Sequence, residues 1–338
     1  MEREQKIGEN LRVGLISISA PAVLAPLSGV TDVVFRRIAK RLGAGLVISE
    51  MVASDELVQG SEEAQLRAEG AGIEPHVVQL AGCDPRWMAE GAQIAEAAGA
   101  RVIDINMGCP AKRVIGGYSG SALMRDLDHA CRLIEATVRA VSVPVTVKMR
   151  LGWDHDSINA SELARRAENL GVKAVTVHGR TRQQFYKGHA DWKAIASVVQ
   201  AVSIPVIANG DIGSLEDARK CLGLSNASAV MIGRSAVGRP WIVGQIGAAL
   251  QGRAISVPSP EERTALALEH YEGLLSLYGA KVGIRHARKH LAAYAEAAAE
   301  AGFHVPQSVR TGLVTSDDSS VVMSLLRSLY IHQERDAA

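Results

Sequence analysis

One cysteine in this sequence has the surroundings of a reactive thiol. Cys109 lies in a Gly-Cys-Pro segment that is followed by glycines and by the basic residues Lys112 and Arg113. A cysteine in a basic, glycine-rich loop can act as an acid, a base or a nucleophile. Most buried cysteines, by contrast, are inert, small apolar side chains. His178 and Asn106 could lie nearby, but the spacing alone defines no catalytic triad.

A second candidate is Lys148, which follows a run of Val and Thr residues typical of a buried strand. An ammonium group without a partner would be costly there, so we expect an anionic or electron-rich partner. The N1–C2=O2 edge of a flavin, which gains negative charge on reduction, is one such partner. A Schiff-base lysine and a structural ion pair are the alternatives.

Two glycines and an arginine could bind a phosphate group. Gly210 and Gly233 each follow a predicted strand and would expose backbone N–H groups, and Arg234 adds a planar cation. Many α/β barrels bind a phosphate at the loops after their seventh and eighth strands. Alternatively, these glycines only permit tight turns.

An alternation of short apolar runs and amphipathic stretches positions these residues. The runs are rich in Val and Ile with little polar alternation, which is typical of strands buried on both faces of a parallel sheet. They span residues 23–25, 46–49, 77–80, 102–106, 145–149, 174–178, 206–209 and 229–232. Stretches such as 84–98 and 214–222 have helical spacing between them. A doubly wound sheet would need a G-x-G-x-x-G turn, which is absent, so the pattern predicts an α/β fold of the (β/α)8 TIM-barrel type.

We expect a barrel domain over residues 1–252 and an all-helical domain over residues 253–338. Residues 253–260 contain two prolines and are typical of a linker, and the chain beyond them has helical spacing. In such a barrel the active site lies at the C-terminal ends of the strands, where the candidate residues above are found.

Composition excludes several classes of protein. With 338 residues and 47% hydrophobic residues, the chain is neither disordered nor fibrous, and 37 Lys+Arg against 36 Asp+Glu produce no overall field for nucleic acid. The four cysteines suit neither a zinc knuckle nor a disulfide scaffold, and we interpret Cys83, Cys131 and Cys221 as packing residues. The apolar segment 11–27 is a poor signal peptide, because prolines interrupt it and residues 1–6 have mixed charge. We therefore expect a cytoplasmic protein without a membrane span or a metal site.

One segment is locally basic. Lys281, Arg285, Arg288 and Lys289 have helical spacing, and no acidic residue occurs in the segment 281–290. Together they would form one broad face that could follow a phosphate backbone. A run of charges is more often a solvated face.

The segment 104–112, DINMGCPAK, resembles the signature loop of the tRNA-dihydrouridine synthases. Other segments agree with that family in order and spacing: SEM at 49–51, VQLAG at 78–82, GSAL at 120–123, KMR at 148–150, HGRT at 178–181, IANGD at 207–211 and MIGR at 231–234. GRPW at 238–241 and RHARKH at 285–290 resemble the bacterial B-type branch in particular. The resemblance covers about residues 20 to 295.

The resemblance implies reduction of uridine to 5,6-dihydrouridine in tRNA, expected in the D-loop, with FMN as cofactor and NADPH as reductant. FMN N5 would pass a hydride to C6 of uridine, and Cys109 would donate a proton to C5. Around FMN the resemblance places Pro26, Leu27, Ser28, Gln79, Lys148, His178, Asn209, Gly210, Asp211, Gly233 and Arg234. Leu27 stands where the family usually has Met, a change of similar volume that we expect to have little effect.

The resemblance also assigns contacts to the substrate. Asn106 and Arg150 would hold the uracil edge. The tRNA backbone would be bound by the loop of Lys112 and Arg113 and by the helical domain, with its basic residues Arg285, Arg288 and Lys289. We expect a monomer whose partners are tRNA and NADPH.

Two other functions fit parts of this pattern. An FMN barrel could act on a free pyrimidine, as a dihydroorotate or dihydropyrimidine dehydrogenase does, but a free base would not need a basic helical domain. A non-catalytic RNA-binding protein could also use this fold. Binding alone, however, would not need Cys109, Lys148 and His178.

Overall fold

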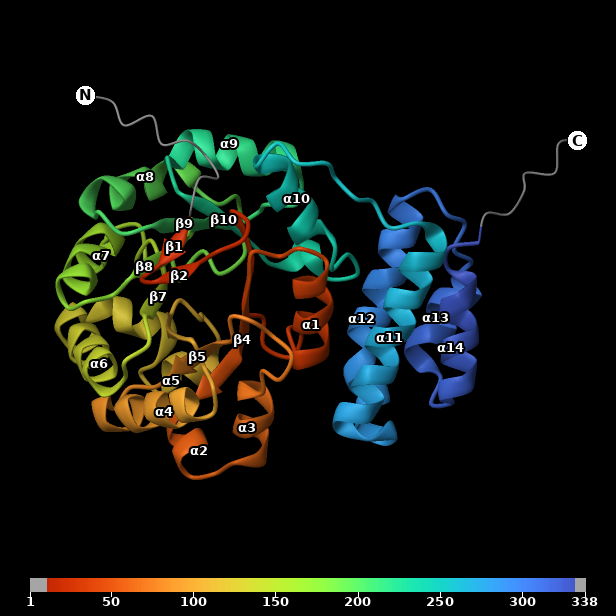
Figure 1. Ribbon diagram of the computed structural model, residues 1–338, viewed down its shortest axis with the longest axis horizontal. Helices are drawn as coiled ribbons and strands as arrows, with labels where there is room; N and C mark the ends of the chain where they lie inside the picture. Colours follow the sequence, from red (N-terminus) through yellow and green to blue (C-terminus); the bar gives the residue numbers. More distant parts are fainter. Residues whose placement is uncertain (1–10, 332–338) are drawn as a thin grey trace, which may run out of the picture.

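The computed structural model describes residues 11–331 and contains a closed barrel followed by a helical region (Figure 1). The barrel strands are β3 (Ala22–Leu24), β4 (Leu46–Ala53), β5 (Val77–Ala81), β6 (Val102–Met107), β7 (Val145–Arg150), β8 (Ala174–His178), β9 (Val206–Asn209) and β10 (Ala229–Ile232). Each pairs in parallel with the next, and β10 closes the barrel by pairing with β3. The predicted (β/α)8 barrel is confirmed, and every predicted strand is present within a few residues of its expected ends.

Strand register brings the candidate residues to one end of the barrel. Asn106 lies beside Lys148 in the ladder of β6 and β7. Arg150 lies beside His178, which in turn lies beside Asn209. Because parallel strands end at the same rim, residues far apart in the sequence share one mouth.

Helices surround the barrel. They are α1 (Val33–Arg41), α2 (Ser54–Val58), α3 (Glu62–Ala68), α4 (Pro85–Ala97), α6 (Leu127–Ala140), α7 (Ala160–Asn169), α8 (Trp192–Ala201), α9 (Leu215–Ser225) and α10 (Ile242–Leu250). Shorter pieces are α5 (Lys112–Gly116), η1 (Gly120–Arg125) and η2 (Arg234–Ala236). The start of α4 shows why these helices begin where they do: Asp84 accepts a hydrogen bond from the Arg86 N–H, and Pro85 occupies the first turn.

A small antiparallel hairpin, β1 (Arg12–Val13) and β2 (Ile16–Ser17), precedes the barrel. Leu11, Val13 and Ile18 pack with apolar residues near the N-terminal ends of the barrel strands, such as Val77 and Val102. This apolar segment therefore belongs to the folded core, while the charged residues 1–6 lie outside the described residues. None of the helices within residues 11–331 is long and apolar enough to cross a membrane.

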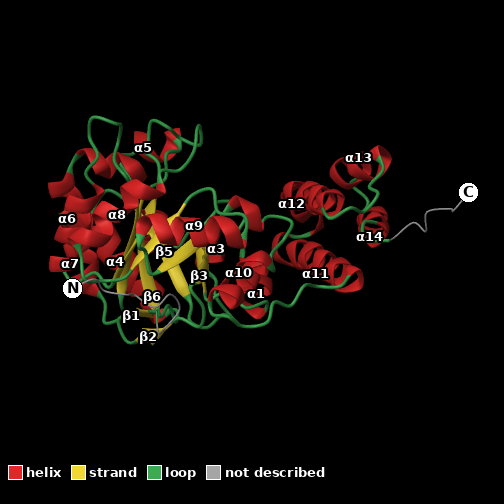
Figure 2. Ribbon diagram, turned by 90° about the horizontal axis from the view of Figure 1, so that it is seen from above, coloured by secondary structure: helices red, strands yellow, loops and turns green. Residues whose placement is uncertain are grey.

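The C-terminal helices form a second packed unit beside α1 (Figures 1 and 2). They are α11 (Pro260–Tyr278), α12 (Ala280–Glu300), α13 (Gln307–Thr315) and α14 (Ser319–Ser328). Their own core contains Tyr271, Leu291 and Leu326, and Leu266 packs on Ile38 of α1. A domain boundary at 252–253 stays a prediction, although α10 ends before it and α11 begins after it.

Candidate active site

The C-terminal ends of the barrel strands open onto a cavity of ≈ 1270 Å³. Its walls include every residue predicted to surround FMN: Pro26, Leu27, Ser28, Gln79, Lys148, His178, Asn209, Gly210, Asp211, Gly233 and Arg234. Cys109, Asn106, Arg150 and Arg113 line it as well. The other predicted cationic residues, Lys112, Arg285, Arg288 and Lys289, are not among the lining residues.

The loop of Cys109 is held through its backbone. Asn106 Oδ1 accepts hydrogen bonds from the N–H groups of Gly108 at 3.1 Å and Cys109 at 2.9 Å. On the other side, the N–H and hydroxyl of Ser121 both donate to the Cys109 carbonyl. Gly120 has a φ of +61°, and a Cβ there would lie 2.8 Å from the Cys109 carbonyl oxygen. The thiol is free and partly exposed, on a loop whose position does not depend on the sulfur.

A buried chain of polar groups supports Asn106 from inside the barrel. The Asn106 amide donates to Gln79 Oε1 at 2.8 Å, and the Gln79 amide donates to Asp104 Oδ2 at 2.6 Å. Thr146 donates to the other oxygen of Asp104 at 2.6 Å. Burial raises the pKa of Asp104, while Thr146 and Gln79 oppose that shift. The supporting role of Asp104 was not predicted from the sequence, although a carboxylate inside an apolar strand indicates a buried polar contact.

Lys148 extends from β7 into the cavity wall. Within the described residues its Nζ donates to the amide oxygen of Asn209 at 3.2 Å rather than to a carboxylate. Burial, followed by the charge of Arg150, lowers the pKa of Lys148 to about 8. The ammonium therefore keeps further hydrogen-bond donors for a ligand. A cation in this position fits the electron-rich edge of a flavin better than a structural ion pair.

The loop after β3, which carries Leu27, is braced by two neighbouring groups. The Leu27 N–H donates to the Thr31 hydroxyl at 2.8 Å. The Gly29 N–H donates to the carboxylate of Glu50, a buried residue of β4 whose pKa is raised by burial. Asp32, at the end of this loop, caps α1. This side of the cavity is therefore attached to both β4 and α1.

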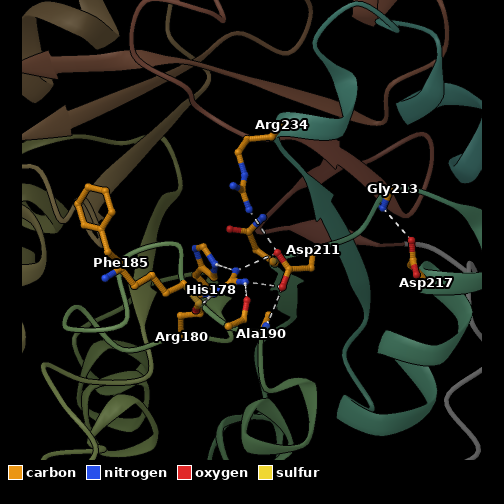
Figure 3. A network of polar contacts seen from close by, with 12 residues as sticks. His178, Arg180, Phe185, Ala190, Asp211, Gly213, Asp217 and Arg234 are labelled. Carbon is orange, nitrogen blue, oxygen red and sulfur yellow. Dashed lines mark hydrogen bonds and ion pairs between the residues drawn. The ribbon is translucent and has the colours of Figure 1, made fainter. Parts of the chain in front are cut away.

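Arg180 and Asp211 form a network between the loops after β8 and β9 (Figure 3). The buried guanidinium of Arg180 donates to both carboxylate oxygens of Asp211, at 2.9 and 2.6 Å, and to carbonyl groups of the segment 187–188. Asp211 also accepts from the Ala190 N–H, and Arg234 approaches it at 3.3 Å. The carboxylate of Asp211 thus braces two loops. The sequence indicated that Arg180 lies at a strand end, in the segment 178–181, but its pairing with Asp211 was not predicted.

Arg180 also determines how His178 is protonated. Its Nη1 lies 3.2 Å from His178 Nε2, and a guanidinium can only donate, so Nε2 accepts and Nδ1 carries the proton. Burial, together with the charges of Lys148 and Arg150, lowers the pKa of His178 well below its usual range. His178 is therefore a neutral N–H donor. Gly210, with a φ of +119°, is required beside it, because a Cβ there would lie 2.9 Å from His178 Cδ2.

Gly233 and Arg234 could hold a phosphate at the end of β10. A Cβ at Gly233 would have within 4 Å only the side chains of Ala25 and Leu27, both at the edge of the cavity. The Arg234 side chain is mostly exposed at the mouth, with its guanidinium 5.1 Å from the Tyr186 ring. Open glycine backbone beside a reachable cation fits a phosphate group. Together with Lys148 and His178, this donor set fits a phosphorylated flavin such as FMN.

Arg150 is a brace in this structure. Its Nε donates to the Gly108 carbonyl at 2.8 Å, and its Nη1 donates to the carbonyls of Thr181 and Phe185, both at 2.8 Å. It therefore ties the Cys109 loop to the loop after β8. The predicted contact of Arg150 with uracil stays a prediction, and Nη2 is the nitrogen left for it.

The cysteines other than Cys109 differ among themselves. Burial raises the pKa of Cys221 to about 12 and also raises the pKa of Cys131, as expected for packing residues. Cys83 is exposed and lines the cavity, so its interpretation as a packing residue is wrong. It follows β5 directly and thereby reaches the rim of the barrel.

The basic segment forms part of α12. Lys281, Arg285 and Lys289 are exposed along one stripe of this helix. Arg288 donates to Asp317 at 2.8 Å, and the role of all four cations in binding a phosphate backbone stays a prediction. The carboxylate of Asp317 comes from the segment between α13 and α14, which sequence spacing within one helix cannot indicate.

Known proteins resemble this chain over most of its length. The family model described as dihydrouridine synthase (Dus) matches residues 23–315. A probable tRNA-dihydrouridine synthase of Rhizobium leguminosarum bv. phaseoli is 55% identical over 311 residues, which are 92% of this chain and 95% of that protein. The tRNA-dihydrouridine synthase B of Pseudomonas aeruginosa is 48% identical over 287 residues, which cover 84% and 86% of the two chains.

Solved structures share the barrel at low sequence identity. Morphinone reductase in complex with tetrahydroNAD has a TM-score of 0.50 and 14% identity, covering 76% of this chain and 93% of that one. A 2-naphthoyl-CoA reductase has a TM-score of 0.57 and 11% identity, covering 74% and 52%. At these identities the likeness shows the fold alone, whereas the relatives above confirm the family resemblance noted in the sequence.

Proposed function

This chain belongs to the dihydrouridine synthase family, and on that premise we propose that it reduces uridine in tRNA to 5,6-dihydrouridine, using bound FMN and NADPH. The observation that carries the proposal is the single cavity lined by Cys109, Lys148 and His178. The thiol of Cys109 as an acid, the ammonium of Lys148 as a cation and the neutral N–H of His178 as a donor would then all face the same substrate. A D-loop target, a monomeric state and a cytoplasmic location stay predictions.

The residues that would hold FMN divide into two groups. The backbone at Gly210 and Gly233, with Arg234, would bind the phosphate. Lys148 would lie against the electron-rich edge of the ring, and His178 would donate from Nδ1. When bound and reduced by NADPH, the flavin supplies the hydride that C6 of uridine accepts.

Cys109 completes the reduction as a general acid. Its Sγ–H donates a proton to C5 of the base, on the face opposite to the hydride, so the thiol must be protonated when it acts. The side chains of Asn106 and Ser121, which hydrogen-bond to the backbone of Cys109, hold the loop in position for this transfer. Such positioning matters because proton transfer depends steeply on distance.

The substrate must reach the cavity as an unstacked base, since a base within a stack cannot meet the thiol. The exposed cations of α12, together with Lys112 and Arg113 on α5, would bind the surrounding backbone. Lys289 lies where α12 approaches the barrel, next to the loop after β3. Its Nζ is 3.0 Å from the position that a Cβ on Gly29 would occupy.

The proposal is tested by following flavin absorbance in protein reduced anaerobically with NADPH. We expect rapid reoxidation by tRNA that lacks dihydrouridine, with dihydrouridine in the digested product, and none by free uracil or orotate. Reoxidation by a free base would instead indicate a pyrimidine dehydrogenase. A purified protein without flavin would favour a binding role on the same fold.

Arg234→Ala should weaken FMN binding by about tenfold or more, because a charge-assisted hydrogen bond to phosphate contributes about 1.5–3 kcal/mol. Flavin release on dilution, followed by fluorescence, measures the effect. Arg239→Ala is the control, since Arg239 pairs with Glu300 away from the cavity. Equal retention of flavin by both variants would contradict the phosphate assignment.

Lys289→Glu should weaken tRNA binding and lower the slope of log affinity against log salt by about one, as expected for the loss of a phosphate contact. Flavin reduction by NADPH should not change. Lys220→Glu, an exposed charge reversal on α9, is the matched control. If both variants bind tRNA equally well, the α12 stripe takes no part in recognition.

A further inference from the structure

The seam between the barrel and the helical region contains a buried ionisable cluster that the proposed function does not use. Asp32 caps α1, His270 belongs to α11 and His290 to α12. Their exposed fractions are 4%, 1% and 2%, respectively. Both histidine Nε2 atoms face the same carboxylate oxygen, Asp32 Oδ2, from His270 at 3.6 Å and from His290 at 4.0 Å.

The polar atoms of this cluster are not satisfied by the protein. The two separations exceed the length of a hydrogen bond. Within the described chain, His270 Nε2 and both ring nitrogens of His290 have no hydrogen-bond partner. Asp32 uses its other oxygen, Oδ1, to accept from the N–H groups of Val34 and Phe35. Buried polar groups are almost always hydrogen-bonded, so a further ligand is expected to contact Asp32 and these histidine nitrogens.

The nearby cation Arg36 does not supply the missing partner of this cluster. Arg36, one turn along α1, directs its guanidinium to the carbonyls of Thr31 and Glu69. The Phe35 ring packs against both imidazoles, with centroids 5.3 Å from His270 and 5.9 Å from His290. The carboxylate of Asp32 therefore faces two imidazole nitrogens in an apolar environment.

We propose that Asp32, His270 and His290 bind a divalent metal ion of the zinc class, which joins the helical region to the barrel. One ligand atom of each residue lies within 4.8 Å of the others. Zinc binds imidazole nitrogen and carboxylate oxygen at about 2.0–2.2 Å, so these ligand atoms would draw closer together around the ion. A water molecule would complete the tetrahedron.

The surroundings suit metal ligation. His270 Nδ1 lies 3.1 Å from the Tyr294 hydroxyl, the type of outer hydrogen bond that orients a metal-bound imidazole.

The test begins with the wild-type holoprotein, stripped with a chelator and then given zinc. We expect about one zinc per chain after dialysis, by mass spectrometry, and an increased midpoint of thermal unfolding. X-ray absorption should show two imidazoles and no sulfur. Substoichiometric zinc, or a sulfur-containing shell that places the ion at a cysteine, would overturn the proposal. A proton shared between Asp32 and the two histidines would then balance the carboxylate charge.

Variants identify the ligands. His270→Gln and His290→Gln should each weaken zinc binding at least tenfold, and Tyr294→Phe should weaken it by a smaller factor. His304→Gln, an exposed histidine of the same helical region, should bind zinc like the wild type. Circular dichroism reports whether each variant is folded. If a variant does not fold, the X-ray absorption spectrum of the wild-type protein shows whether two imidazoles bind the zinc. Unchanged affinity in both folded glutamine variants would overturn the assignment.

Discussion

Cys109→Ala is expected to lower the rate of dihydrouridine formation by at least about 100-fold, the typical contribution of a positioned general acid. The flavin should stay bound and should still be reduced by NADPH. The reason lies in the loop: the hydrogen bonds that hold it use the backbone of Cys109, so alanine removes the proton donor without releasing the loop. Single-turnover reoxidation by tRNA, with dihydrouridine measured in the digest, reports the chemical step alone.

Cys83→Ala is the matched control for this prediction. Cys83 is also a free thiol that lines the cavity, and it is more exposed than Cys109. Its replacement should leave turnover near the wild-type rate. Wild-type turnover in Cys109→Ala, or equal losses in both variants, would remove Cys109 from the role of proton donor.

Arg180→Leu is expected to lower the free energy of unfolding by about 3 kcal/mol, because it leaves Asp211 with the mostly exposed Arg234 as its ion-pair partner and removes the hydrogen bonds to the segment 187–188. The Arg180 side chain is 2% exposed and that of Asp211 is 24% exposed, so little solvent is available to replace the lost hydrogen bonds. Urea unfolding of the flavin-free protein measures this change. His178 should also lose its enforced Nδ1–H tautomer, which nitrogen NMR of the histidine ring can detect.

The control for Arg180 is an ion pair of the same length on the surface. Arg166 and Glu162 also approach to 2.6 Å, but each side chain is 37% exposed and Arg166 also pairs with the exposed Asp128, so Arg166→Leu should cost less than about 1 kcal/mol. Equal losses in the two leucine variants would show that Arg180 contributes no more than a surface residue.

The effect of Arg180→Leu should depend on pH in a defined direction. Burial opposes ionisation of Asp211, but Arg180 and the Ala190 N–H lower its pKa below the usual value. A carboxylate with a lowered folded-state pKa contributes stability above the unfolded-state pKa and loses it as the pH falls through the folded-state pKa. The difference between wild type and variant should therefore shrink in acid.

Local patterns in the sequence determined the architecture and most of the cavity. Each barrel strand is recognisable as a short apolar run, and most of these runs are rich in Val and Ile, because both faces of a parallel barrel strand are buried. The positions of Cys109, Lys148 and His178 follow from the same pattern, since the end of each strand must lie at one rim. Knowing the strand ends was enough to place these residues in one cavity.

Which side chains pair across that framework depends on the closed fold. Arg180 with Asp211, Arg288 with Asp317 and Asp32 with the two histidines all join segments from different elements. Periodicity reports which face of an element is buried, but hydrogen bonds and ion pairs depend on distances that exist only after the barrel closes and α11 and α12 pack beside α1. The role of Lys148 at a strand end could therefore be interpreted from its neighbours in the chain. Asp32, in contrast, meets the two imidazoles only when the helical region packs against the barrel.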